Sequence, residues 1–193
     1  MTSTPAPGKR SARERLLEAA DRLFYSEGIH TVGIDRVLDE AGVAKGSLYY
    51  NFGGKDDLVR TYLQNRHANW AARIDDRIQA ATAPAEKVLA VYDALGELFS
   101  EPGFRGCAFI NAAAEAPTGS AEDLATKDFR TWLHSLFEAL VGDAGYHNPR
   151  LLSAQLVLLY DGSNIAAAMD GNHQAALAAR AAAEALLQAA SRI

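Results

Sequence analysis

Cationic, hydroxyl and aromatic side chains lie close together between residues 45 and 55 of the 193-residue chain. Lys45, Ser47, Tyr49 and Tyr50 are followed by Lys55. Ammonium and hydroxyl groups donate hydrogen bonds to phosphate oxygens, and lysine can also reach the acceptor edge of a guanine. If one short helix presents these side chains together, their chemistry predicts a surface that binds DNA.

Two short helices are needed to position these side chains. The apolar residues of the first follow the i, i+3, i+4, i+7 spacing of one helix face. They are Ile34, Val37, Leu38 and Ala41. Gly42 can adopt positive φ just past the helix end. A second helix from 44 to 51 turns Leu48 and Phe52 inward and its cationic, hydroxyl and aromatic side chains outward. This pattern is typical of a DNA-reading helix-turn-helix.

The segment AGVAKGSLYYNFGGKDDLV, residues 41–59, resembles the helix-turn-helix signature of the TetR (tetracycline-repressor-like) family of bacterial transcription regulators. The segment LLEAADRLFYSEG, residues 16–28, resembles the first helix of that family. The chain departs from the family at Gly33, Ala44 and Gly54, where hydroxyl side chains are common. The resemblance covers roughly the first third of the chain, and the remainder matches in helical character and length only.

The resemblance implies a set of DNA contacts. The set is Thr31, Lys45, Gly46, Ser47, Tyr49, Tyr50 and Lys55. Within it, Lys45 and Tyr50 are assigned to base edges or the adjoining backbone. Phosphates are assigned mainly to the side chains of Thr31, Ser47, Tyr49 and Lys55. Lys9, Arg10 and Arg13, near the N-terminus, are expected to follow the backbone or the minor groove.

The distribution of charge is compatible with DNA binding at the N-terminal end. The net charge of −5 argues against a uniformly basic nucleic-acid binder. Residues 1–66 contain 10 Lys and Arg against 9 Asp and Glu, whereas residues 67–193 contain 9 against 15. The positive charge thus lies where phosphates would be met, although both balances are equally compatible with ordinary solvated surface.

Cysteine content and hydropathy favour a cytoplasmic protein. Cys107 is the single cysteine, so no disulfide can form within the chain. It lies in an apolar run without a catalytic partner motif, which favours a buried structural thiol over a nucleophile or redox sensor. No stretch approaches the ~18 apolar residues of a membrane span, and residues 1–15 lack the apolar segment of a signal peptide.

The whole chain reads as all α, with about nine helices. After the first three, helices are expected at 58–81, 85–100, 107–116, 121–141, 150–168 and 174–191. The helix at 107–116 is expected to be buried because it is nearly uncharged. We expect a disordered basic tail at 1–10 and a helix-turn-helix domain at 11–58. A helical ligand-binding and dimerisation domain follows at 59–193, joined to the head through the long fourth helix.

The resemblance also places a ligand pocket among the helices of the C-terminal domain. The candidate lining residues are His67, Trp70, Phe99, Phe109, Asn111, Trp132, Asp161 and Asn164, and Tyr160 is a further aromatic candidate. Apolar walls with few polar groups suit a small, largely hydrophobic molecule. The alternatives are that the aromatic residues only fill a core and that the polar residues bond to one another. The scattered histidines predict no metal site, and no cofactor is expected.

Two functions from different classes remain open at this point. The first is a transcriptional regulator, a repressor that binds a palindromic operator as a dimer through its last two helices and is released by the ligand. The second is an all-helical ligand carrier or enzyme whose N-terminal helices are only structural. The chain shows no catalytic constellation of acid, base and nucleophile, which favours the regulator.

Overall fold

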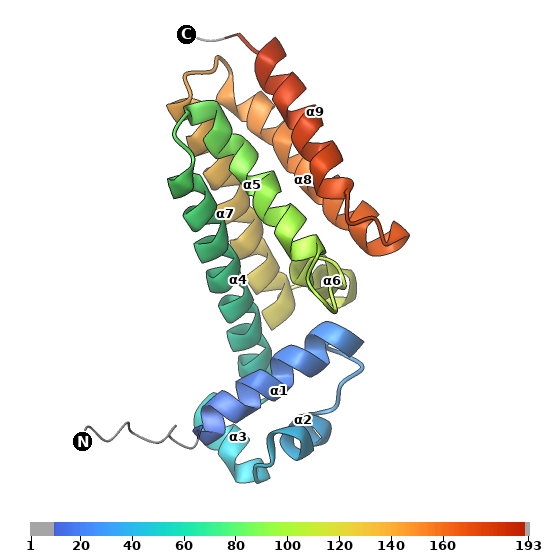
Figure 1. The fold of residues 1–193 in the computed structure, drawn as a ribbon. Coiled ribbons are helices and arrows are strands. Elements are labelled where there is room, and N and C mark those ends of the chain that lie inside the picture. Colours follow the sequence, from blue (N-terminus) through green and yellow to red (C-terminus); the bar gives the residue numbers. More distant parts are fainter. Residues whose placement is uncertain (1–9, 192–193) are drawn as a thin grey trace, which may run out of the picture.

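The computed structural model describes residues 10–191, and this part of the chain forms nine α-helices and no β-strand (Figure 1). The helices are α1 (Ala12–Glu27), α2 (Ile34–Ala41), α3 (Lys45–Phe52), α4 (Lys55–Ala80), α5 (Pro84–Phe99), α6 (Ala108–Glu115), α7 (Ala121–Asp143), α8 (Pro149–Asp170) and α9 (Ala175–Ala189). The all-α expectation is confirmed. Within the described residues, no helix has both the length and the apolar character that crossing a membrane requires. The predicted tail, apart from Arg10, lies outside the described residues.

Helices α1–α3 form a small head whose boundaries follow local chemistry. The Ser11 hydroxyl accepts a hydrogen bond from the backbone N–H of Glu14 at 3.2 Å, and the Glu14 carboxylate accepts one from the backbone N–H of Ser11 at 2.7 Å. This is the predicted capping box. Gly42 ends α2 with φ 60°, a conformation that costs glycine little. Leu48 and Phe52 anchor α3 in the head core.

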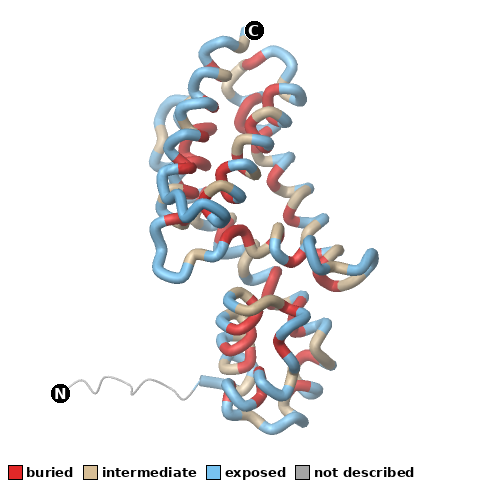
Figure 2. Tube along the Cα trace, turned by 90° about the vertical axis from the view of Figure 1, so that its right-hand side faces the viewer, coloured by how far each residue is buried: buried red, intermediate tan, exposed pale blue. Residues whose placement is uncertain are grey.

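The 26-residue helix α4 joins the head to the body, which consists of α4–α9 (Figure 1). At a rise of 1.5 Å per residue it is roughly 39 Å long. Its first turns pack Leu58 and Tyr62 against the head, and its later turns pack Trp70 and Ile74 against the body. Figure 2 shows buried positions along the inward sides of the helices in both parts. One continuous helix can therefore transmit a tilt between them.

The body is a helical bundle whose aliphatic interior also contains a row of aromatic rings. α5 packs against α4, α7 and α9, and α8 packs between α7 and α9. Tyr92 of α5 is buried, and its hydroxyl donates to the carbonyl oxygen of Leu156 in α8 at 2.7 Å. Tyr92, Phe137 and Tyr160 form a chain of ring contacts across α5, α7 and α8. The interior thus holds three separate helices in fixed positions.

The expectation of a buried helix at 107–116 was wrong in part. The helix is present as α6, but only Phe109 and Ala112 within it are buried. Asn111 and Glu115 are exposed, because α6 packs mainly on α7, with fewer contacts to α4. Alanine side chains are small enough to be exposed at little cost, so the low charge of this segment did not mean that it was buried.

Candidate nucleic-acid interface and interior cavity

α3 presents most of the predicted DNA contacts on one exposed surface. We call Lys45, Gly46, Ser47, Tyr49 and Tyr50 the α3 face. Tyr50 is 90% exposed, Tyr49 and Lys45 are also exposed, and Ser47 is half-buried. Lys45 Nζ lies 3.5 Å from Asp35 Oδ1 in α2, but both side chains are solvated, so this ion pair is weak. The face is therefore available to a partner outside the chain.

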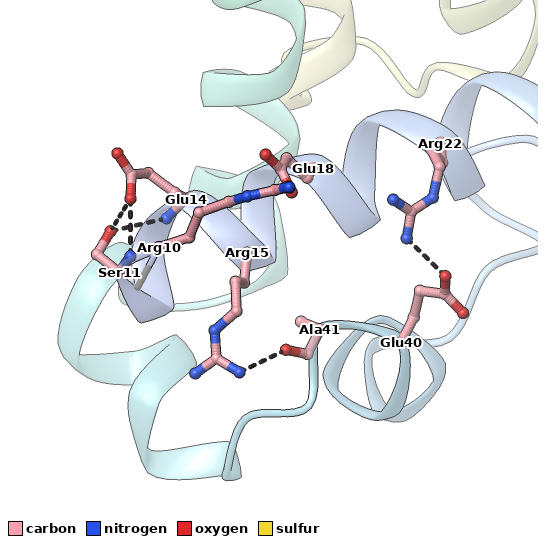
Figure 3. Close-up of polar contacts among 8 residues, drawn as sticks. All are labelled: Arg10, Ser11, Glu14, Arg15, Glu18, Arg22, Glu40 and Ala41. Carbon is pink, nitrogen blue, oxygen red and sulfur yellow. Dashed lines mark hydrogen bonds and ion pairs between the residues drawn. The ribbon is translucent and has the colours of Figure 1, made fainter. Parts of the chain in front are cut away.

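Helix α1 braces the turn that carries this face. Arg15 Nη1 donates to the carbonyl oxygen of Ala41 at 3.0 Å (Figure 3). It also donates to the carbonyl oxygen of Gly42 at 2.9 Å. Carbonyls at a helix C-terminus lack partners within the helix, and Arg15 supplies one here. A second link joins the same two helices, because Arg22 of α1 pairs with Glu40 of α2 at 2.5 Å (Figure 3). The turn between α2 and α3 is thus fixed relative to α1.

Lys55, predicted to contact phosphate, has partners within the head. Its Nζ donates to the carbonyl oxygens of Ile29 at 2.7 Å and Val32 at 2.8 Å, in the loop between α1 and α2. The ammonium also lies 5.8 Å from the centre of the Phe24 ring. Two of its three N–H donors are therefore used to fasten this loop to the start of α4.

The remaining predicted DNA contacts are distributed around the head. Thr31 is exposed on the loop that Lys55 fastens. Arg10 pairs with Glu18 of α1. The guanidinium of Arg13 lies over the Phe52 ring, 5.1 Å from its centre, at the end of α3. Lys9 lies outside the described residues. The assignment of each side chain to DNA stays a prediction.

A cavity of about 550 Å³ lies between α1 of the head and the body. Trp70, Phe109 and Asn164 line it, as predicted. Its other lining residues include Leu17, Asp21 and Tyr25 from α1, Arg66 from α4, Cys107 before α6 and Tyr160 from α8. The volume falls in the range of sites for drug-sized molecules. Because α1 forms part of the wall, an occupant would touch the head as well as the body.

The other five predicted ligand residues do not line this cavity. His67 packs edge-on against the rings of Phe109, Phe129 and Trp132, with centroids 4.8 to 6.2 Å apart. Phe99 packs against Phe104. Asn111 and Asp161 have partners within the protein, although these partners are not one another or Asn164, as the alternative had it. Asn111 Nδ2 donates to the carbonyl oxygen of Arg105 at 3.0 Å, and Asp161 pairs with Arg130 at 2.6 Å.

Polar contacts cross between head and body beside the cavity, and we call this set the seam. The Tyr25 hydroxyl donates to the Gly106 carbonyl at 2.9 Å and accepts from the Arg105 backbone N–H at 2.9 Å. The guanidinium of Arg105 binds the last carbonyls of α1, those of Tyr25 and Ser26. Arg66 of α4 makes a two-point ion pair with Asp21 of α1 at 2.6 and 2.8 Å. The loop between α5 and α6 is thus a second link to the head besides α4.

The seam and the α1 side of the cavity were missed from sequence. Asp21 and Tyr25 lie outside the apolar face of α1, so the helical pattern marked them as ordinary surface. Tyr25 stands 81 residues from Gly106, and no local pattern connects the two. Cys107 is buried, as expected, but it lines the cavity. Burial raises the pKa of its thiol, so the sulfur is uncharged at neutral pH.

Comparisons with known proteins agree with this geometry. Residues 16–62 match the family model described as bacterial regulatory proteins, tetR family. The crystal structure of SCO4454, a TetR-family transcriptional regulator from Streptomyces coelicolor, superposes with a TM-score of 0.86 at 33% identity. That match covers 92% of this chain and 94% of SCO4454.

Two curated relatives match over shorter lengths. The transcriptional regulator LmrA of Bacillus subtilis is 38% identical over 90 residues, which are 46% of this chain and 48% of LmrA. The transcriptional repressor KstR2 of Mycolicibacterium smegmatis is 31% identical over 83 residues, 42% of this chain and 40% of KstR2. The chain therefore spans about half the length of these two relatives or less.

Proposed function

The chain belongs to the TetR family of bacterial regulatory proteins, and on this premise we propose that it represses transcription by binding a palindromic operator as a homodimer. A small, largely hydrophobic effector then releases it from DNA. Members of this family regulate transcription through a helix-turn-helix and are not enzymes, which sets aside the carrier or enzyme alternative. The observation that carries the proposal is the α3 face, a solvated cationic and aromatic surface on a braced turn.

The α3 face supports a division of labour among its side chains. Lys45 and Tyr50 stand at the exposed side of a helix thin enough to enter the major groove, so we assign them to base edges or the adjoining backbone. Thr31, Ser47 and Tyr49 bind phosphates. Lys55 retains one free N–H and acts chiefly by fixing the loop that carries Thr31. We propose residues 11–58 as the DNA-binding unit and 59–193 as the ligand-binding and dimerisation unit.

An apolar strip on α8 and α9 supports the homodimer. Leu151, Leu158 and Ile165 recur every seven residues along α8 and are exposed, as is Leu177 at the start of α9. Large apolar side chains gathered on one exposed surface mark an interaction site. A twofold axis through this surface would bring together the same patch of both subunits, so that every contact between two different residues occurs twice. Two α3 faces could then read two half-sites about one helical turn apart or more.

The position of the cavity supports release by an effector. The cavity touches α1 of the head, and it also touches α4 and the loop between α5 and α6, which both bond to α1 and hold the head in place. An effector that fits one orientation of the head better than another shifts the population toward that orientation. A tenfold change in DNA affinity requires a difference of about 1.4 kcal/mol between the two states.

A gel-shift assay with DNA fragments from around the protein's own gene tests the proposal. One fragment should shift at lower protein concentration than the others, and affinity should fall steeply as salt rises because phosphate contacts release counterions. Equal retardation of every fragment, or none, would contradict an operator-binding regulator. Loss of reporter expression when the gene is deleted would make the chain an activator and reverse the proposed sign.

A further inference from the structure

Two residues that line the cavity each hold a buried polar atom without a hydrogen-bond partner. Asn164 is 1% exposed and Trp70 is 9% exposed, and both line the cavity. The Asn164 amide donates from Nδ2 to the carbonyl oxygen of Tyr160 at 3.0 Å, which leaves its Oδ1 without a donor. The indole Nε1–H of Trp70 also lacks a hydrogen-bond partner. Buried polar groups without partners are rare and costly, so a molecule that satisfies both would gain free energy.

These two atoms require complementary chemistry. Asn164 Oδ1 is an acceptor and needs a donor, whereas the indole N–H of Trp70 is only a donor and needs an acceptor. The hydroxyl of Tyr160, which also lines the cavity, can both donate and accept a hydrogen bond. Its approach to the Trp70 N–H opposes part of the rise that burial causes in the pKa of Tyr160, but it falls short of hydrogen-bond geometry. A single hydroxyl on a bound molecule can accept from Trp70 and donate to Asn164.

Charges around the cavity are already matched within the protein. Three arginines line it, and each is paired with a carboxylate: Arg66 with Asp21, Arg73 with Glu101 and Arg22 with Glu40. The third carboxylate of the lining, Glu18, is paired with Arg10. A charged molecule would have to break one of these pairs or remain uncompensated in a partly buried site.

Much of the remaining lining is apolar, and its polar members, such as Asn65 and Asn69, are uncharged. The rings of Phe109 and Phe129 stack with centroids 3.9 Å apart and, with Leu17 and Leu98, form apolar lining. Burial raises the pKa of both the Tyr160 phenol and the Cys107 thiol, so neither is ionised near neutral pH. These walls suit a flat hydrocarbon skeleton.

We propose that the effector is a neutral apolar molecule with a hydroxyl group, an alcohol or a phenol, which is recognised by Trp70 and Asn164 in the cavity. That the bound molecule acts as an effector rests on the proposed function, but its binding can be measured without DNA.

A series of naphthalene derivatives tests the inference by isothermal titration calorimetry on the full chain. 2-Naphthol carries a hydroxyl, 2-methoxynaphthalene can accept but cannot donate, naphthalene can do neither, and 2-naphthoate is an anion. We expect 2-naphthol to bind about tenfold more tightly than 2-methoxynaphthalene, because a lost hydrogen bond leaves Asn164 Oδ1 unpaired. Equal affinity for the neutral compounds, or preference for 2-naphthoate, would overturn the inference.

Two variants connect the preference to named atoms. Asn164→Leu should bind 2-naphthol and 2-methoxynaphthalene with nearly equal affinity, because it removes the acceptor and retains a similar volume. Trp70→Phe should weaken both about equally, because both lose their donor. Thermal melting establishes that each variant folds, and if Asn164→Leu is unstable, Asn164→Asp gives a second test, in which the preference for 2-naphthol over 2-methoxynaphthalene should grow as the new carboxylate ionises, because a carboxylate accepts the hydroxyl proton more strongly than an amide oxygen does. Preference for 2-naphthol that survives in folded Asn164→Leu would overturn the assignment.

The outcomes also separate this inference from the proposed function. If the chain shifts operator DNA but does not discriminate among the naphthalene compounds, only the effector chemistry is wrong. If it prefers 2-naphthol but shifts no DNA fragment, the proposed function is wrong and the hydroxyl site stands.

Discussion

The α3 face and the cavity use polar side chains in opposite ways. On the α3 face, Lys45 and Tyr50 stand in water, and the one ion pair of Lys45 is solvated and weak. In the cavity, Asn164 and Trp70 are buried and retain unpartnered atoms because the surrounding packing holds them there. Exposed groups gain affinity only from a partner whose own charges replace water, such as phosphate. Buried groups have already lost water and so reward any ligand that fits.

The two regions also differ in what maintains them. The α3 face depends on α1, through Arg15 and Arg22, and on Lys55. The cavity depends on several helices and on the seam that Tyr25, Arg66 and Arg105 form. Interface and cavity therefore share α1, which makes α1 the element through which one can affect the other.

The largest effect is expected from separating the two copies of the α3 face. Leu158 is 70% exposed and lies in the middle of the apolar strip on α8, so Leu158→Arg should yield a folded monomer. Each α3 face would then bind its half-site alone, and operator affinity should drop about 100-fold or more. Light scattering at micromolar concentration gives the mass, and a binding titration gives the affinity.

Leu124→Arg is the matched control, because Leu124 is also an exposed leucine but lies on α7. It should remain dimeric and bind operator normally. A parent protein that is already monomeric at micromolar concentration would contradict the dimer.

Lys55→Met tests whether Lys55 belongs to the interface or to the scaffold under it. The change removes hydrogen bonds from an ammonium to two carbonyls, so we expect the free energy of unfolding to fall by about 1.5–3 kcal/mol. Urea unfolding measures this loss, and Lys87→Met on α5 serves as the control. A parent-like stability combined with a salt slope lower by about one would instead make Lys55 a phosphate contact.

Tyr25→Phe tests the seam without any effector. It keeps the ring and removes the hydroxyl that joins α1 to Arg105 and Gly106, a loss of about 1 kcal/mol. Amide hydrogen exchange should accelerate about fivefold near the end of α1. Tyr92→Phe, which loses a bond within the body, should accelerate α5 and α8 instead. If amide exchange accelerated equally along the whole chain in both variants, the seam would not stabilise the end of α1 locally.

The smallest effect concerns pH and the ring cluster around His67. Burial lowers the pKa of His67, opposed in part by Asp128. The unfolded chain therefore takes up the proton first, and this residue costs stability as pH falls below about 6.5. Melting temperatures at pH 7.5 and 5.5 should differ less for His67→Leu than for the parent. An identical pH dependence in the two proteins would rule out this contribution.

The sequence predicted best those features that short segments determine. The capping box at Ser11 and the turn at Gly42 depend on neighbouring residues, and both are present. The family resemblance assigned Lys55 to phosphate, which stays a prediction, and no local pattern could show its hydrogen bonds to carbonyls more than 20 residues earlier. Trp70, Phe109 and Asn164 could be proposed as cavity residues because a large or polar side chain within an apolar helix can be recognised from the sequence of that helix alone. Tyr25 was missed because its role depends on a distant loop.

The most direct test of the central claim measures how the chain distinguishes its operator from a scrambled duplex. Fluorescence anisotropy titrations over a series of salt concentrations give both the affinity ratio and the salt slope for the parent, Lys45→Ala and Tyr50→Ala. We predict that Lys45→Ala lowers the difference in binding free energy between operator and scrambled duplex by about 1–3 kcal/mol while leaving the protein dimeric and folded, and that Tyr50→Ala lowers it in the same direction. Parent-like ratios and slopes in both variants would contradict the assignment of the α3 face to DNA.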